Sequence, residues 1–211
     1  MTMPRIDSQS VEIAGPAGRL QAVVAEPASD GSLYGVVCHP HPLFGGTMDN
    51  KVVTTVAKAL ADCAVPTLRF NFRGVGSSHG TYDEGVGETD DAAAVAEWGE
   101  RRWPGRRLVL AGFSFGAYVA LRVAQRRTLA GLILVAPPVG RFDFAGLVPP
   151  RCPWMVIQGD ADDVVDSARV IDWARRSVPE PKLVCLPGVG HFFHGRLAEL
   201  RDAVIAEIRS V

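Results

Sequence analysis

A short glycine-rich motif, Gly112-Phe113-Ser114-Phe115-Gly116, joins a predicted strand directly to a predicted helix. The strand is the apolar run Leu108–Ala111, and the helix begins with the run Ala117–Ala124. A strand that turns at once into a helix brings its backbone segments close together, so a Cβ on either flanking glycine would clash. Such a turn points the serine hydroxyl away from the sheet, beside the positive end of a helix dipole. The motif therefore predicts a serine nucleophile at the edge of a sheet.

An acid and a histidine follow two later predicted strands, in that order along the chain. A serine hydroxyl is a weak nucleophile that needs a base, and the base needs an acid to orient it. Asp162 follows the β-like run Pro153–Gln158, and His191 follows the β-like run Lys182–Leu186. Because the carboxyl ends of parallel strands share one edge of a sheet, we expect a triad of Ser114, Asp162 and His191. Three nearby carboxylates are rivals for the acid: Asp160, Asp163 and Asp166.

Three parts of the chain resemble small lidless α/β-hydrolases related to the dienelactone-hydrolase-like proteins. They are residues 38–50, residues 69–78 and the serine motif with its acid and histidine. The resemblance runs from about Val11 onward and implies a serine hydrolase that cleaves an ester or a thioester. It also implies Asp162 as the acid, in a Gly-x-x-Asp-x-x-Val segment. The chain has serine where dienelactone hydrolases have cysteine, so their substrate is not implied.

Strand and helix signals alternate along the chain, which predicts a mainly parallel sheet covered by helices on both faces. We expect an α/β-hydrolase fold of about eight strands in one domain spanning residues 1–211. Strands are predicted at residues 11–14, 20–26, 33–38, 67–72, 108–111, 130–136, 153–158 and 182–186. Helices are predicted at residues 47–63, 88–102, 117–124, 167–178 and 196–209.

The segment between residues 136 and 153 is the place where many α/β-hydrolases insert a helical lid. In this chain the segment is short and has prolines near both ends, which makes a covering helix improbable. We therefore expect no lid domain, and a serine that is open to solvent on that side.

An acyl-transfer site also needs two hydrogen-bond donors for the oxyanion of the tetrahedral intermediate. The N–H of Phe115, directly after the serine, is the first candidate. The second should come from the loop after the strand that ends at Cys38. Pro40 and Pro42 have no N–H, which leaves His41 or Leu43. The resemblance favours Leu43.

All five histidines lie in or beside loops that follow predicted strands. The spacings His39-x-His41 and His191-x-x-His194 would allow a zinc site, but no His-Glu-x-x-His motif or paired cysteines accompany them. We therefore predict no metal. His39 and His41 are better explained as hydrogen-bonding residues that fix their loop, and His194 as part of the first turn of the last helix.

Two other features have ordinary structural explanations. The segment from Arg73 to Ser77 predicts a tight turn with the arginine paired to a carboxylate, and a clamp for a substrate carboxylate is the alternative. The four cysteines are widely spaced and predict reduced thiols: Cys38, Cys63, Cys152 and Cys185.

Composition excludes several classes of function. The net charge is −1 and no basic block is present, so nothing indicates a nucleic-acid partner. No stretch approaches the ~20 apolar residues of a membrane span, and residues 1–10 lack the apolar core of a signal peptide. We expect a cytoplasmic enzyme that needs no cofactor and acts on a small-molecule ester. Peptide or amide cleavage on the same triad is one alternative, and a non-catalytic scaffold that binds a partner is another.

Overall fold

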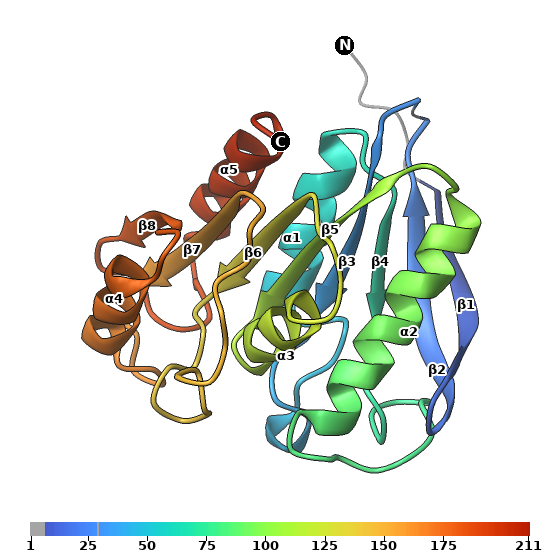
Figure 1. Ribbon diagram of the computed structural model, residues 1–211, viewed down its shortest axis with the longest axis horizontal. Helices are drawn as coiled ribbons and strands as arrows, with labels where there is room; N and C mark the ends of the chain where they lie inside the picture. The colour runs from blue at the N-terminus through green and yellow to red at the C-terminus, as the bar shows by residue number, and fades with distance from the viewer. Residues whose placement is uncertain (1–6, 29) are drawn as a thin grey trace.

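The computed structural model describes residues 7–28 and 30–211, and these residues form one eight-stranded sheet with helices on both faces (Figure 1). The strand order is β1-β2-β4-β3-β5-β6-β7-β8. β2 pairs antiparallel with β1 and β4, and the other pairs are parallel. The predicted fold is confirmed. The strand bounds are β1 Asp7–Gly15, β2 Gly18–Glu26, β3 Leu33–Cys38, β4 Thr67–Phe70, β5 Arg107–Phe113, β6 Gly131–Val135, β7 Trp154–Gly159 and β8 Lys182–Leu186.

Two helices cover one face of the sheet and three cover the other (Figure 1). α1 (Lys51–Asp62) and α5 (Leu197–Ile208) contribute to one buried apolar cluster. α2 (Val86–Arg102), α3 (Phe115–Ala124) and α4 (Ser167–Arg176) contribute to the cluster on the opposite face. A sheet that is covered on both sides needs strands that are apolar on both faces. β6 and β7 meet this need, since every one of their residues is buried.

The ends of several helices differ from the predicted ones by a few residues, and capping explains one of them. α1 begins at Lys51, not near residue 47, because the Asn50 side chain accepts a hydrogen bond from the Val52 N–H at 2.9 Å and ends the preceding loop. α5 begins at Leu197, so His194 lies in the turn before this helix. Its predicted position in the first helical turn was wrong.

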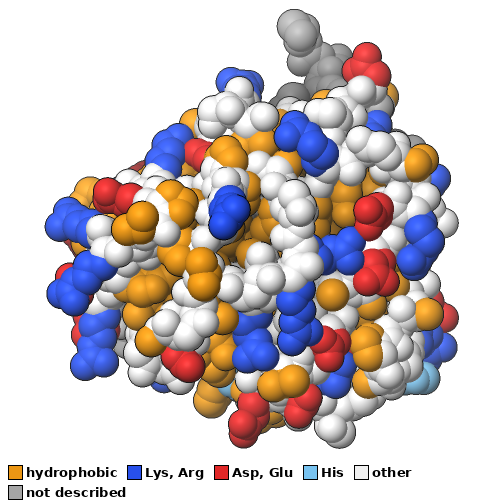
Figure 2. Space-filling view, viewed as in Figure 1, with side chains coloured by type: hydrophobic (Ala, Val, Ile, Leu, Met, Phe, Trp, Pro, Cys, Tyr) orange, Lys and Arg blue, Asp and Glu red, His pale blue; other side chains and the backbone are white. Residues whose placement is uncertain are grey.

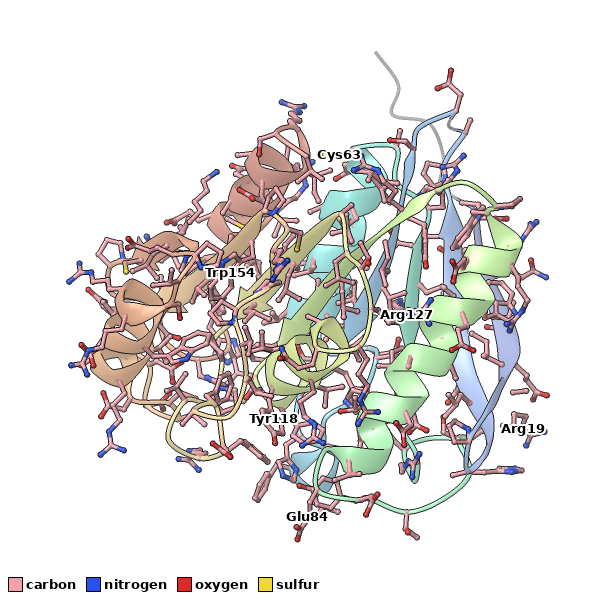
Figure 3. All side chains as sticks on the ribbon, in the orientation of Figure 1. Arg19, Cys63, Glu84, Tyr118, Arg127 and Trp154 are labelled. Carbon is pink, nitrogen blue, oxygen red and sulfur yellow. The ribbon has the colours of Figure 1, made fainter. Side chains whose placement is uncertain are left out.

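The segment between β6 and β7 contains no helix and is tied to the body of the protein, so the predicted absence of a lid is confirmed. The ring of Phe142 stacks on that of Tyr118 in α3, with centroids 4.8 Å apart. The side-chain amide of Gln125 accepts a hydrogen bond from the Val148 N–H and donates one to its carbonyl oxygen. Figure 3 shows Tyr118 in the lower part of the molecule, above Glu84, which precedes α2.

The surface carries both signs of charge. Figure 2 shows Lys and Arg side chains interspersed with Asp and Glu over the face that bears α2, α3 and α4. This distribution agrees with the net charge of −1. Within the part of the chain that the structure describes, every helix is too short or too polar to span a bilayer.

Candidate active site

Ser114 occupies the sharp turn between β5 and α3. Its backbone has φ 52° and ψ −119°, a conformation that is strained for a residue other than glycine. The two flanking glycines are required by close contacts. A Cβ at Gly112 would collide with the carbonyl of Gly116, and a Cβ at Gly116 would collide with the carbonyl of Cys38 at the end of β3. The elbow therefore holds the serine against the end of the neighbouring strand.

The structure brings the three predicted triad residues together. His191 Nε2 lies 3.1 Å from Ser114 Oγ, and His191 Nδ1 lies 2.8 Å from Asp162 Oδ2. The histidine is 3 % exposed and the Asp162 carboxylate is fully buried. Ser114 keeps 9 % of its surface exposed, so the expected open serine is instead a sheltered one. The arrangement allows His191 to accept the serine proton while its other nitrogen donates to the aspartate.

Backbone donors fix the carboxylate of Asp162. Its Oδ1 accepts hydrogen bonds from the N–H groups of Val164 and Val165, at 2.9 and 2.7 Å. Burial acts to raise the pKa of this carboxyl group, but the hydrogen bonds from His191 and the two N–H groups outweigh burial and lower the pKa. Asp162 is therefore held in its charged form beside His191.

Packing of the loop after β8 positions His191. Phe193 is fully buried with φ 53°, and its place in the core anchors the loop on the far side of the histidine. The Phe113 ring, from the last residue of β5, lies 5.0 Å from the His191 ring. At Gly159, a Cβ would collide with the carbonyl of Val189, so the end of β7 contacts this loop directly.

Two of the three rival acids form other hydrogen bonds, and the third is exposed. Asp160 accepts a hydrogen bond from the Gly188 N–H, and Asp166 caps α4 by accepting one from the Arg169 N–H. Asp163 is exposed. Among the described residues, the carboxylate that contacts His191 is that of Asp162.

The loop after β3 contains both candidates for the second oxyanion donor. The Leu43 N–H donates to His41 Nδ1 at 3.2 Å, and the Leu43 side chain is 67 % exposed. The backbone N–H groups of His41 and Phe115 have no hydrogen-bond acceptor among the described residues. The rings of these two residues lie 5.0 Å apart, so the two unpaired N–H groups belong to neighbouring residues.

His39 and His41 fix this loop through their side chains, as predicted. His39 is buried: its Nε2 accepts a hydrogen bond from the Phe72 N–H at 3.0 Å, so its Nδ1–H donates to the Pro40 carbonyl at 2.6 Å. Burial lowers the pKa of His39 to about 4. His41 Nδ1 accepts from a backbone N–H, so its Nε2–H donates to the hydroxyl of Tyr82 at 3.1 Å.

The remaining sequence candidates have structural roles. Arg73 forms two side-chain hydrogen bonds with the buried carboxylate of Asp91, as the prediction of a paired arginine required. Across residues 7–28 and 30–211, no three histidine, cysteine or acidic side chains gather in a way that could hold a metal ion. The four cysteines are free thiols.

Two polar contacts near the triad were missed by the sequence analysis. Gln158 Nε2 donates to Asp162 Oδ2 at 3.0 Å, and Tyr82 contacts His41 as described. Gln158 had a detectable signal, since it is a polar residue at the end of the apolar run Trp154–Ile157. Tyr82 had none, because it lies far from His41 in the sequence.

Known proteins resemble the chain over most of its length. A family model described as serine aminopeptidase, S33 matches residues 43–150. An uncharacterized protein of Rickettsia prowazekii is 36 % identical over 200 residues, covering 90 % of this chain and 84 % of that protein.

Two solved structures are also similar. One is a lidless α/β serine hydrolase from Xanthomonas campestris, with a TM-score of 0.91 and 45 % identity, covering 100 % of this chain and 97 % of the other. The other is an α/β serine hydrolase homologue from Coxiella burnetii, with a TM-score of 0.92 and 45 % identity, covering 98 % of this chain and 100 % of the other. The chain therefore belongs to the family described as serine aminopeptidase, S33, and is a small lidless serine hydrolase of the α/β-hydrolase fold.

Proposed function

We propose that the protein hydrolyses a small soluble ester or thioester through an acyl-enzyme, with Ser114, His191 and Asp162 as the catalytic triad. The observation that carries the proposal is the continuous hydrogen-bonded chain from Ser114 Oγ through His191 to Asp162. The strained backbone of Ser114 supports it, because such strain is typical of functional sites. A scaffold that only binds a partner has no need for either feature.

In the first half of the reaction, Ser114 Oγ attacks the acyl carbonyl carbon while His191 Nε2 takes the hydroxyl proton. Asp162 stabilises the imidazolium that forms. The tetrahedral intermediate then breaks its bond to the leaving group, which takes the proton from His191 and departs as an alcohol or a thiol. The acyl group remains on Ser114.

In the second half, water attacks the acyl-enzyme. His191 takes a proton from this water and returns it to Ser114 Oγ as the carboxylic acid leaves. The sequence of steps balances with water as the second substrate and needs no cofactor.

For the oxyanion hole we propose the N–H groups of Phe115 and His41, in place of the Leu43 N–H favoured by the sequence. The Leu43 N–H is already engaged by His41 Nδ1, whereas those of Phe115 and His41 have no acceptor among the described residues. Unpaired donors that are fixed before substrate arrives cost no reorganisation during the reaction.

The anchored segment between β6 and β7 supports a small, soluble substrate. A lipase lid opens at a lipid surface, but here Phe142 and Val148 are held against α3 and the residue that follows it. We expect hyperbolic kinetics on short-chain esters, with no jump in rate at the critical micelle concentration of the substrate. Such a jump would contradict this part of the proposal.

Covalent labelling tests the function. A fluorophosphonate probe should form one adduct, mapped to Ser114 by peptide mass spectrometry, and Ser114→Ala should abolish it. Ser177→Ala is the matched control, since the Ser177 hydroxyl bonds to the Trp173 carbonyl in α4, away from the triad. Esters, thioesters and amides of one acyl group should then be compared. A rate that is highest on amides would replace the esterase proposal with a peptidase, while full turnover by Ser114→Ala would end the serine-hydrolase mechanism.

A further inference from the structure

Gln158 is a buried polar residue next to the acid of the triad. It is the fifth residue of β7, follows four buried apolar residues and has no exposed surface. Its Nε2 donates two hydrogen bonds, each of 3.0 Å, one to the Gly159 carbonyl and one to Asp162 Oδ2. The second bond reaches the same oxygen that accepts from His191 Nδ1.

The orientation of this amide leaves its oxygen without a partner. Gln158 Oε1 is the one buried side-chain nitrogen or oxygen atom, among the described residues, that makes no hydrogen bond. The opposite orientation would place Oε1 against two acceptors, the Gly159 carbonyl and the Asp162 carboxylate, and would be worse. The Gln158 amide therefore keeps its hydrogen bond to Asp162 although its oxygen is buried without a partner, which is uncommon in native structures.

We propose that Gln158 is a positioning residue of the triad, which holds the Asp162 carboxylate in the plane that His191 Nδ1–H requires. This inference rests on the proposed function. Asp162 has two donors on each oxygen: the Val164 and Val165 N–H groups on Oδ1, and Gln158 with His191 on Oδ2. The backbone donors fix one oxygen, and Gln158 fixes the direction of the other, so that the carboxylate does not rotate away from the histidine.

A purely structural role makes a different prediction. A residue that only fills space at the end of β7 would be served by an unbranched apolar side chain, without the unpartnered oxygen. Replacement of Gln158 would then affect stability and leave turnover alone. A positioning role predicts the reverse, because loss of the donor misplaces Asp162 while the strand keeps its packing.

The first test replaces the amide by an apolar side chain of similar length. Gln158→Met should lower kcat on the order of 10-fold to 100-fold, with KM changed by less than about threefold, because misorientation affects the chemical step. Gln125→Met is the matched control: it removes a glutamine that also bonds to the backbone, but to Leu121 and Val148 away from the triad. Its kcat should equal that of the wild type.

The second test uses pH and the conservative variant Gln158→Glu. A protonated glutamic acid can donate to Asp162 Oδ2, whereas an ionised one faces the carboxylate with like charge, which raises the pKa of one of the pair. Three titratable groups surround this position: Asp162, His191 and Cys185, the register partner on β8. The rate of Gln158→Glu should fall at higher pH as the introduced acid ionises beside Asp162. The wild type and Gln158→Met should lack the falling limb.

The outcomes separate this inference from the proposed function. If the wild type hydrolyses no ester and Ser114 is not labelled, the proposed function fails. If wild-type Ser114 reacts normally, the inference is overturned by a Gln158→Met kcat within twofold of the wild-type value, or by a Gln158→Glu profile with no falling limb. If Gln158→Met does not fold, the Gln158→Glu profile alone decides, since its protonated form keeps the hydrogen bond to Asp162.

Discussion

The loop after β7 and the loop after β3 lie at the same edge of the sheet, yet they are held in different ways. The loop after β7 surrounds a charge, because the carboxylate of Asp162 accepts hydrogen bonds from two backbone N–H groups of that loop. The loop after β3 surrounds a neutral ring, because one nitrogen of His41 accepts a hydrogen bond from a backbone N–H and the other donates one to Tyr82. Each loop also bonds to a distant segment: the N–H groups of Asp160 and Ala161 donate to carbonyls at the end of β8 and just beyond it, and His41 donates to Tyr82.

The pKa of one group in each loop is lowered, and the consequence for its charge differs between the two loops. The pKa of Asp162 is lowered, which keeps the acid ionised beside His191. Burial lowers the pKa of His41, which keeps its ring neutral and its Nδ1 free to accept the Leu43 N–H. Protonation of His41 would remove that acceptor. The same physical effect, a shift towards lower pKa, therefore maintains a charge in one loop and its absence in the other.

The largest effect is expected from a substitution in the charged loop. Asp162→Asn should lower kcat on the order of 10³- to 10⁴-fold, because the amide presents His191 with the wrong hydrogen-bonding partner. Asp163→Asn is the matched control in the same loop and should retain nearly full activity. Steady-state kinetics on one short-chain ester measure both. A crippled Asp163→Asn with an active Asp162→Asn would mean that the acid is misassigned.

A smaller loss should follow when the neutral loop loses its proposed oxyanion donor. Replacing the amide N–H of residue 41 by an ester oxygen, with the imidazole retained, should reduce kcat on the order of 10²- to 10³-fold. The same replacement at residue 43 should cost far less, because the Leu43 N–H already bonds to His41. Ester-backbone variants made by incorporation of the α-hydroxy analogues of histidine and leucine would measure this. The reverse order of effects would restore Leu43 as the donor.

The next effect is on stability and comes from His39, at the base of the neutral loop. Its pKa falls from 6.5 to about 4 on burial, so between these values the unfolded chain binds a proton that the native protein does not. Stability is therefore full above pH 6.5 and declines as the pH falls towards 4, by about 2 kcal/mol between pH 7.5 and 5. Urea unfolding at a series of pH values measures this loss. His39→Gln should flatten the decline, and an equally steep decline in that variant would assign it to other groups.

The smallest effect is expected from a substitution that removes only the hydrogen bond between His41 and Tyr82. Tyr82→Phe deletes the hydroxyl that accepts from His41 Nε2 and keeps the ring that packs 4.9 Å away. We expect a loss of about threefold to tenfold in kcat, since the Leu43 N–H still holds the other nitrogen. Tyr34→Phe, at a buried tyrosine bonded to the Ala96 carbonyl in α2, is the control and should leave kcat unchanged. A larger loss from Tyr82→Phe than from the ester substitution at residue 41 would reverse the importance given to these two groups.

The contrast between the loops also explains which parts of the site could be predicted from sequence. Ser114, Asp162 and His191 each follow a strand, and their order and spacing are visible in the printed chain. The geometry of the Leu43 N–H was not visible, because it depends on the rotamer of His41 and on the contact with Tyr82 from a distant segment. The amide of Gln158 was likewise missed, since periodicity assigns a strand residue to a face but does not indicate where its nitrogen points.

The fold was more predictable than its boundaries. β6 and β7 are buried on both faces and therefore gave continuous apolar runs, and α5 gave apolar residues at helical spacing because one side of it is buried. Helix starts such as that of α1 were displaced by single side chains, here the Asn50 cap, whose choice among nearby polar residues depends on local geometry.

The contact between Gly116 and the end of β3 has a consequence for how this enzyme could change over evolution. The backbone of α3 at Gly116 lies against the carbonyls of Cys38 and His39, so the spacing between Ser114 and the loop after β3 is set by main chain against main chain. The exposed side chains of Phe44 and Phe192 take no part in that main-chain contact, although their rings lie 4.7 Å from the His41 ring and 5.1 Å from the His191 ring. Substitution of these exposed side chains would therefore change the surroundings of His41 and His191 while the main-chain contact between α3 and β3 is kept.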